Sequence, residues 1–523
     1  MLPIYPTRSL PTLAWIAIAL VVSVVRAQSP PKAGDDRDWA FRPPQRPEIP
    51  QVADRQWIRT PVDAFVLARL ELAGLQPSPQ ADRRTLARRI YFDLTGLPPT
   101  PEQLDSYLAD RSVDAYSRLV DRLLGSPEYG ERWAQHWLDV VRYADSDGFE
   151  YDDPRPHAWR YRDWVIEALN SDKPFHRFVR DQIAADELYP GDRAALAALG
   201  LHRLGPLRLN AGLQDDAKNR QEVLTEIVDA VGTAFLGLTF GCARCHDHEF
   251  DPITQGDYYG MQAVFAATQP IDVPLVPVGM EPATDEKKTV PSFMAIWDRD
   301  RDREIPATFI LERGEAHQRL GEVQPTVPSI LVSAGEAAGL TVHRRPTTIG
   351  GDSDGDSTGR RAALAEWLTR ADHPLTARVF INRLWMHHFG RGIVATPNDF
   401  GAMGAAASHP GLLDWLAVEF ADNDWSIKHL HRLMVLSATY QQSSSTLSNS
   451  SARDPDNELL WRANRRRLEA EVIRDAMLAV SDSLNRSMGG PGVRLPLPPE
   501  IAKLQYKGTW QEDPDQTRHL QRT

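Results

Sequence analysis

The chain has 523 residues, 42% of them hydrophobic, two cysteines and a formal net charge of −12 at pH 7. A chain of this length exceeds what one ordinary hydrophobic core holds, so we expect two or more domains. The acidic balance argues against a general nucleic-acid-binding protein, and we expect no nucleic-acid partner.

Residues 1–27 have the pattern of a secretory signal peptide. Arg8 supplies a positive charge, residues 13–25 form an apolar run, and Val25-Arg26-Ala27 is a small-x-small cleavage site. The apolar run is too short for a comfortable transmembrane span. We therefore expect export to the periplasm, the cell surface or the medium, with membrane attachment only if this segment stays uncleaved.

A polar, Pro-rich lead-in over residues 28–54 precedes a series of helical signals. Thr60-Pro61 opens the first predicted helix and Gly74 ends it. The second spans 82–94 before Gly96, and the third opens at Thr100 with Gln103 in the capping-box position. The same periodicity predicts helices over 115–124, 130–143, 159–169, 174–184, 220–236 and 254–266.

Residues 269–358 interrupt this pattern, because proline, glycine and valine are frequent and β-like runs occur at 307–311 and 329–332. Helical spacing then returns over 361–369, 375–389, 409–421, 426–440 and 468–484. The predicted fold is mainly α. It has two helical domains, over 55–268 and 359–523, joined by a Pro/Gly-rich irregular segment with a few short β-strands.

The only two cysteines belong to the run Cys242-Ala243-Arg244-Cys245-His246. C-x-x-C-H is the attachment signature of c-type haem. The two thiols form thioethers with the haem vinyl groups, and the histidine is the proximal iron ligand. An export signal favours this interpretation, because bacterial thioether attachment occurs outside the cytoplasmic membrane. The predicted cofactor is therefore covalent haem c.

The sequence does not decide which group is the sixth iron ligand. Met261, on the following predicted helix, and His136, between two tryptophans, are the candidates, and the position can also be open to small molecules. Three other interpretations of the motif remain. They are a small-loop disulfide, a redox dithiol, and a divalent-metal site that adds His248 and Asp251 to His246.

Several stretches resemble a planctomycete two-domain family. Residues 93–100 (DLTGLPPT), 129–133 (YGERW) and 242–253 (CARCHDHEFDPI) are similar to the planctomycete cytochrome-c-like domain of unknown function. Residues 373–378 (HPLTAR), 396–401 (TPNDFG) and 437–440 (SATY) are similar to the planctomycete-specific domain that follows it. The resemblance implies an exported protein with a C-x-x-C-H motif. Because relatives continue further, it also implies that the second domain is truncated at its C-terminus.

The leading functional hypothesis is an exported c-type haem protein. It would serve electron transfer or a haem-linked redox step within a larger periplasmic or surface system, beside a redox partner or a secreted enzyme. The alternatives are an exported metal-dependent hydrolase or carbohydrate-acting protein, and a non-catalytic scaffold for a secreted enzyme. The second helical domain, over 359–523, has no nucleophile elbow, phosphate loop or zinc-protease signature.

Overall fold

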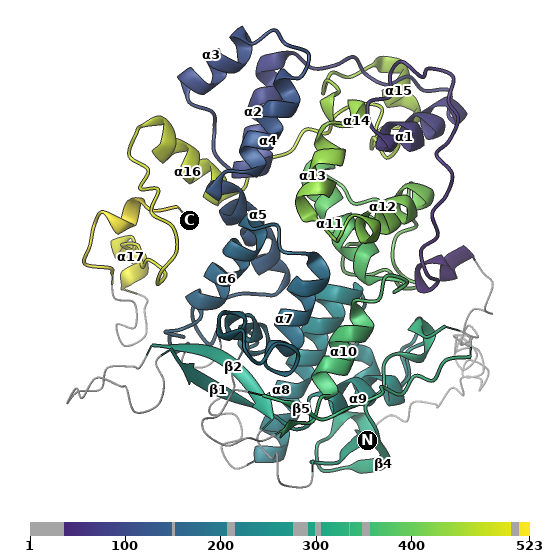
Figure 1. Cartoon of the computed structure of the whole chain (residues 1–523), viewed down its shortest axis with the longest axis vertical. Coiled ribbons are helices and arrows are strands. Elements are labelled where there is room, and N and C mark those ends of the chain that lie inside the picture. The colour runs from purple at the N-terminus through teal and green to yellow at the C-terminus, as the bar shows by residue number, and fades with distance from the viewer. Residues whose placement is uncertain are drawn as a thin grey trace, which may run out of the picture.

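The computed structural model describes residues 36–148, 152–206, 215–275, 291–298, 305–333, 335–347, 356–503 and 512–522. In these ranges the chain is mainly helical, and its strands form three separate antiparallel pairs, which confirms the predicted fold class (Figure 1). The predicted signal peptide over 1–27 lies outside the described residues. Among the helices described, none is long and apolar enough to cross a membrane.

Nine helices form where the sequence predicts them in the first region. Asp82 caps α2 by accepting a hydrogen bond from the Thr85 amide at 2.9 Å, and Gly96 ends that helix in the left-handed conformation. Thr100 and Gln103 form the predicted capping box of α3. The helices are α1 (Pro61–Leu72), α2 (Arg83–Thr95), α3 (Pro101–Ala109), α4 (Ala115–Leu124), α5 (Pro127–Val140), α6 (Trp159–Asn170), α7 (Phe175–Leu188), α8 (Asp216–Val231) and α9 (Gln255–Val264).

Two features of this region differ from the prediction. The helix expected over 220–236 ends as an α-helix at Val231 and continues as a π-helical turn, Gly232–Leu236. A 3-10 helix, Arg193–Arg203, was not predicted. Its leucines Leu196 and Leu199 pack against the strand pair that follows, so tertiary contact rather than periodicity stabilises it.

The connecting region contains the strand pairs. β1 (Thr268–Pro274) pairs with β2 (Ser292–Asp298), β3 (Thr308–Leu311) with β4 (Arg319–Val323), and β5 (Arg345–Pro346) with β6 (Asp356–Ser357). The predicted run at 307–311 is therefore confirmed. The run at 329–332 was wrong, because Ser329–Leu331 forms a 3-10 turn after Pro328 instead of a strand.

The second helical region contains α10 (Arg360–Leu368), α11 (Thr376–Phe389), α12 (Pro410–Asp422), α13 (Ile427–Val435), α14 (Ala438–Gln441), α15 (Ser448–Arg453), α16 (Ala470–Val480) and α17 (Pro499–Ala502). The single helix expected over 426–440 is wrong, since Ser437 separates α13 from α14. The buried carboxylate of Asp63 on α1 accepts the Ala438 and Thr439 amides, both at 2.9 Å, and so begins the new helix.

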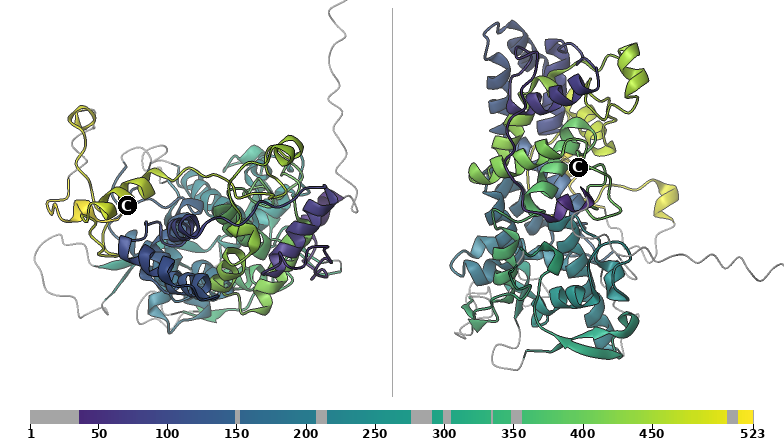
Figure 2. Two further views of the ribbon diagram at one scale, coloured as in Figure 1. Left: turned by 90° about the horizontal axis from the view of Figure 1, so that it is seen from above. Right: turned by 90° about the vertical axis from the view of Figure 1, so that its right-hand side faces the viewer.

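The two helical regions share one hydrophobic core. Phe175 of α7 stacks on Phe380 of α11 with ring centroids 3.9 Å apart, and Phe380 stacks in turn on Phe420 of α12. Figures 1 and 2 show α7 beside α10 and α1 beside α14. Helices more than 170 residues apart in the sequence are thus packed against each other, and the core continues through both regions.

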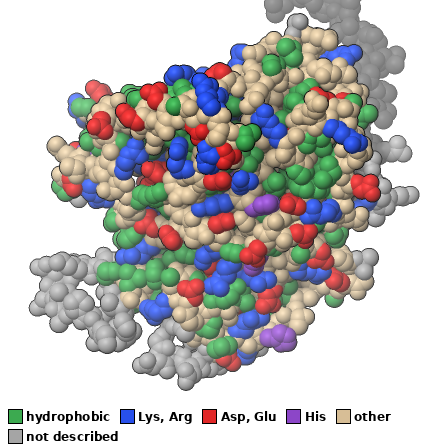
Figure 3. All heavy atoms as spheres, turned by 45° about the horizontal axis from the view of Figure 1, so that its top comes forward, with side chains coloured by type: hydrophobic (Ala, Val, Ile, Leu, Met, Phe, Trp, Pro, Cys, Tyr) green, Lys and Arg blue, Asp and Glu red, His purple; other side chains and the backbone are tan. Residues whose placement is uncertain are grey.

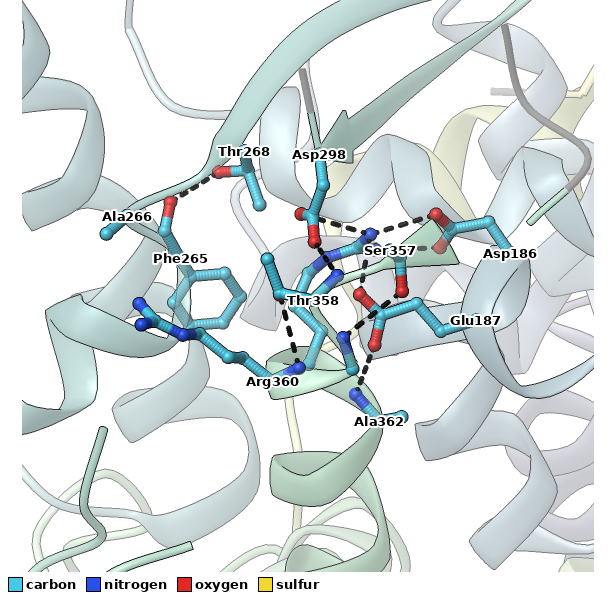
Figure 4. A network of polar contacts seen from close by, with 12 residues as sticks. Asp186, Glu187, Phe265, Ala266, Thr268, Asp298, Ser357, Thr358, Arg360 and Ala362 are labelled. Atoms are coloured by element: carbon cyan, nitrogen blue, oxygen red, sulfur yellow. Dashed lines mark hydrogen bonds and ion pairs between the residues drawn. The ribbon is translucent and has the colours of Figure 1, made fainter. Parts of the chain in front are cut away.

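A buried ionic cluster fixes the start of α10 (Figure 4). Arg361 is fully buried and binds Asp186 of α7 through two hydrogen bonds of 2.7 and 2.8 Å. Its guanidinium also lies 3.0 Å from Glu187 and 3.6 Å from Asp298 of β2. Burial raises the pKa of Glu187 to about 8; Asp298 and Asp186 add to the rise and Arg361 opposes it.

Replacing Arg361 by methionine is expected to destabilise the fold, because the buried carboxylates of Asp186 and Asp298 would lose their cation. Breaking a buried pair in this way costs about 3–5 kcal/mol. The matched control is Arg345→Met, which removes an exposed 2.7 Å pair with Glu366 and should cost below about 1 kcal/mol. Urea unfolding of both variants measures the difference, and equal losses would contradict the role of the cluster.

Glu187 also predicts a pH dependence. Because its pKa is raised from 4.5 to about 8 in the folded protein, the folded state retains a proton that the unfolded state releases. Its contribution to the unfolding free energy is present below about pH 4.5 and is lost as the pH rises to about 8. Glu187→Gln keeps an oxygen for the Ala362 amide, which Glu187 accepts at 2.7 Å. The variant should lose less stability than the parent between about pH 5 and 8, and parallel unfolding curves would contradict this.

Candidate functional site

The C-x-x-C-H motif begins on a short 3-10 turn, Gly241–Arg244, that follows the end of α8. Cys242 and Cys245 are both exposed and are not joined in a disulfide. A side chain on Gly314, whose φ is +76°, would place its Cβ 3.3 Å from the Cys245 sulfur. The turn after β3 therefore approaches this thiol closely only because Gly314 has no side chain.

Residues of α8 and α9 hold the motif turn in place through Arg244. The Arg244 guanidinium pairs with Glu222 of α8 at 2.8 Å. Its carbonyl accepts the Tyr259 hydroxyl at 2.8 Å and the Gln255 side-chain amide at 3.4 Å, both from α9. The turn is thus anchored from two helices while both thiols face outwards.

His246 is exposed and its ring is oriented by the backbone. Its Nδ1 lies 2.7 Å from the carbonyl oxygen of Asp247. A carbonyl can only accept, so Nδ1 carries the proton and the Nε2 lone pair remains available. This tautomer is the one that a histidine needs in order to bind iron or another metal through Nε2.

His248 and Asp251 are held by backbone contacts instead. The Nδ1 atom of His248 accepts the Asp251 amide at 2.9 Å, so its Nε2 carries the proton. Asp251 is buried, and its Oδ1 accepts the Ala402 amide at 2.6 Å. A Cβ on Gly401 would lie 2.3 Å from this oxygen, so glycine permits the close approach. In the part of the chain that the structure describes, no three His, Cys, Asp or Glu side chains converge as metal ligands.

The second helical region also fixes the chain that leads into the motif. Arg383 of α11 donates to the carbonyls of Ala234 and Thr233 in the π-helical turn, at 2.5 and 2.6 Å. The Phe400 amide donates to the Gly237 carbonyl at 2.9 Å. The bonds of Arg383 and Phe400 hold the chain before the motif, and the bond between Asp251 and the Ala402 amide holds the chain after it. Both ends of the motif loop are therefore attached to the second helical region.

The two predicted sixth ligands lie elsewhere. Met261 is fully buried, and it lies two residues beyond Tyr259, on the opposite side of α9 from the face that holds the motif turn. His136 of α5 stacks on His387 of α11, with ring centroids 3.6 Å apart. Within the described ranges, no hydrogen bond or ring contact joins either residue to His246.

Asp229 is a residue beside the motif that the sequence did not single out. It lies on α8, and its Oδ2 is 3.8 Å from where a Cβ on Gly241 would lie. Burial raises the pKa of Asp229 to about 6, with Glu226 adding to the rise. A carboxyl group that exchanges its proton near neutral pH therefore lies beside the start of the motif turn at Gly241. Asp229 precedes Cys242 by 13 residues in the sequence, so its position beside the motif becomes visible only in the fold, where the chain turns back over α8.

The exposure of both thiols gives a direct test of this geometry. We expect the reduced protein without haem to react with Ellman's reagent at two thiols per chain before any denaturant is added. Cys242→Ser should leave one reactive thiol, with the same unfolding midpoint as the parent. Reaction only after unfolding in guanidinium would contradict the exposed turn.

Two family comparisons cover most of the chain. Residues 61–270 match PSCyt2, described as a protein of unknown function (DUF1549), and residues 360–523 match PSD1, also described as a protein of unknown function (DUF1553). Comparison with curated proteins and with solved structures finds no match. The matched ranges correspond to the two helical regions of the fold. The chain therefore matches the PSCyt2 and PSD1 family models in tandem, the first before the second.

Proposed function

We propose that the protein is an exported c-type haem protein, in which Cys242 and Cys245 attach the haem and His246 binds its iron. The orientation of His246 carries the proposal. Its Nδ1 proton is held by the Asp247 carbonyl at 2.7 Å, and the residue is exposed and directly follows Cys245 in the sequence. A proximal haem ligand requires this combination of a fixed ring and a free nitrogen.

The surroundings of the motif fit a covalently attached macrocycle. Both thiols are accessible, as thioether formation requires, and Arg244 fixes the turn between them. Phe250, four residues beyond His246, leaves 50% of its surface exposed and offers an apolar contact for a porphyrin. When bound, haem supplies one-electron transfer or small-molecule chemistry at its iron.

We propose that the sixth position is open or is filled from outside the described residues. Met261 is fully buried on the far side of α9, and His136 is engaged with His387. An exposed motif with an open position suits contact with a soluble redox partner or a small molecule. Export, inferred from residues 1–27, would place this partner in the periplasm or at the cell surface.

The divalent-metal alternative is less well supported by the contacts around the motif. It would require His248 and Asp251 beside His246. The Nδ1 atom of His248 and the Oδ1 atom of Asp251 both accept backbone amides, and the proton on the His248 Nε2 leaves that nitrogen without a lone pair. The observations therefore favour haem over a metal-dependent hydrolase at this position.

Periplasmic expression with the haem-attachment machinery tests the proposal. We expect a haem stain on denaturing gels and a pyridine haemochrome spectrum typical of thioether-linked haem. Cys242→Ala should lower the covalent haem content by about tenfold or more, because one linkage is lost and maturation requires both. His246→Ala should remove the absorption bands of histidine-ligated haem, whereas His343→Ala, at another exposed histidine, should change neither measurement.

A colourless protein with two titratable thiols, made alongside a positive-control cytochrome, would contradict the proposal. Elemental analysis of that protein would then decide between the remaining interpretations. One bound transition metal per chain, lost in His248→Ala, would indicate the metal site. The absence of metal would indicate a redox dithiol, since two titratable thiols exclude a disulfide.

A further inference from the structure

A cavity of about 730 Å³ lies between the two helical regions, away from the cysteine motif. It is bounded by α2, by α5, by the C-terminal end of α11, by α14 and by the segment over residues 460–469. Its volume falls within the range of small-molecule sites in proteins, about 300–1,000 Å³. Residues matched to PSCyt2 form one wall and residues matched to PSD1 form the other.

The lining of this cavity is strongly basic. It contains seven arginines and two carboxylates, although the whole chain has a net charge of −12. Figure 3 shows acidic and basic side chains interspersed over the face that it draws, so this concentration of one sign is local. The arginines are Arg88, Arg89, Arg132, Arg462, Arg465, Arg466 and Arg467.

Five of these arginines have no acidic partner among the residues that the structure describes. Arg132 pairs with Glu469 at 2.9 Å, and Arg466 pairs with Asp93. The other five form no ion pair with a carboxylate in the described ranges. Like charges that lie close together repel one another, so such a group is expected where an external anion neutralises it.

The back of the cavity is rigid. Asp93 is buried and accepts the Tyr440 hydroxyl at 2.7 Å as well as the Arg466 guanidinium. Burial by itself would raise the pKa of Asp93, but Arg466, His388 and Tyr440 outweigh it and lower the pKa to about 2. Asp93 is therefore always charged at neutral pH and holds Arg466 in place.

Arg89 is held without being neutralised. Its guanidinium donates to the carbonyls of Tyr440 and Gln442, the second at 3.1 Å, and these neutral acceptors leave its charge available. Arg462 lies over the Trp461 ring, 5.0 Å from its centroid. The positive groups are thus positioned before any ligand arrives, which lowers the entropic cost of binding.

We propose that this cavity binds a small ligand that carries two or more tetrahedral oxyanion groups, such as phosphate or sulfate esters. Guanidinium forks match the oxygens of these groups, and five uncompensated charges exceed what one monoanion would neutralise. The limited volume of the cavity, about 730 Å³, and the acidic remainder of the chain favour a small polyanion over a long nucleic acid.

Calorimetric titration of the full mature chain tests the proposal, with tripolyphosphate and inositol hexasulfate as probes. We expect saturable binding of at least one probe, weaker at higher salt because the contacts are ionic. The double variant Arg88→Gln/Arg465→Gln should weaken binding by roughly tenfold or more. Both side chains are exposed, so the fold should persist, and thermal unfolding checks this.

The matched control is Arg84→Gln, one turn before Arg88 on the same helix and outside the cavity lining. It should change the affinity by less than about twofold. A parent protein that binds neither probe would overturn the proposal, as would equal losses in the double variant and the control. Equal binding of a single-stranded oligonucleotide in the parent and the double variant would assign any nucleic-acid affinity to another surface. Haem is not needed for this assay, so its result is independent of the function proposed above.

Discussion

Arg361 is the contact on which the arrangement of the two helical regions depends. It lies in the first turn of α10 and reaches carboxylates of α7 and β2, so one side chain joins three distant stretches of the sequence. The same carboxylates also satisfy the start of the helix: Glu187 accepts the Ala362 amide and Asp298 accepts the Thr358 amide, both at 2.7 Å. These acidic side chains therefore lie at the N-terminus of α10, where negative charge stabilises a helix.

A cluster of this kind is better suited to selecting one arrangement than to adding stability. Removing the charged groups of Arg361, Asp186 and Asp298 from water costs several kcal/mol per ion, and the attraction between them roughly repays that cost. Any other docking of α10 would leave the Asp186 and Asp298 carboxylates buried without a cation, so alternative arrangements are disfavoured. Because α10 leads directly into α11, the position of Arg361 also sets where Arg383 meets the turn that precedes the cysteine motif.

Local signals account for the part of the fold that the sequence predicted. Asp82, Gly96, Thr100 and Gln103 act within one or two turns of the helices they cap, so their effect can be recognised without the tertiary structure. The misses depend on distant partners. β1 pairs with β2 across residues 275–291, and Asp63 divides the helix expected over 426–440 from 375 residues away. Periodicity contains no information about either contact.

The candidate site divides in the same way. The spacing of Cys242, Cys245 and His246 is visible in the sequence because the chemistry needs adjacent residues. The groups that hold the motif turn are not visible in the sequence, since Glu222 and Tyr259 come near Arg244 only through the packing of α8 and α9. The arginine-lined cavity could not be predicted from the sequence either. The helix α2 and the segment over 460–469 each supply only part of its arginines, and they meet only in the folded structure.

Both candidate sites therefore require both domains. Asp251 and the Gly237 carbonyl attach the motif loop to residues 400–402, and the cavity has one wall from each domain. A positively charged cavity is compatible with a net charge of −12 for the whole chain, because charges on a protein surface are screened over about 8 Å at physiological ionic strength. An anion near the cavity responds to the unpaired arginines around it, while the acidic remainder of the surface is too distant to cancel their field. The net charge of −12 thus constrains what approaches the molecule at random, and the local arrangement of arginines decides what is bound.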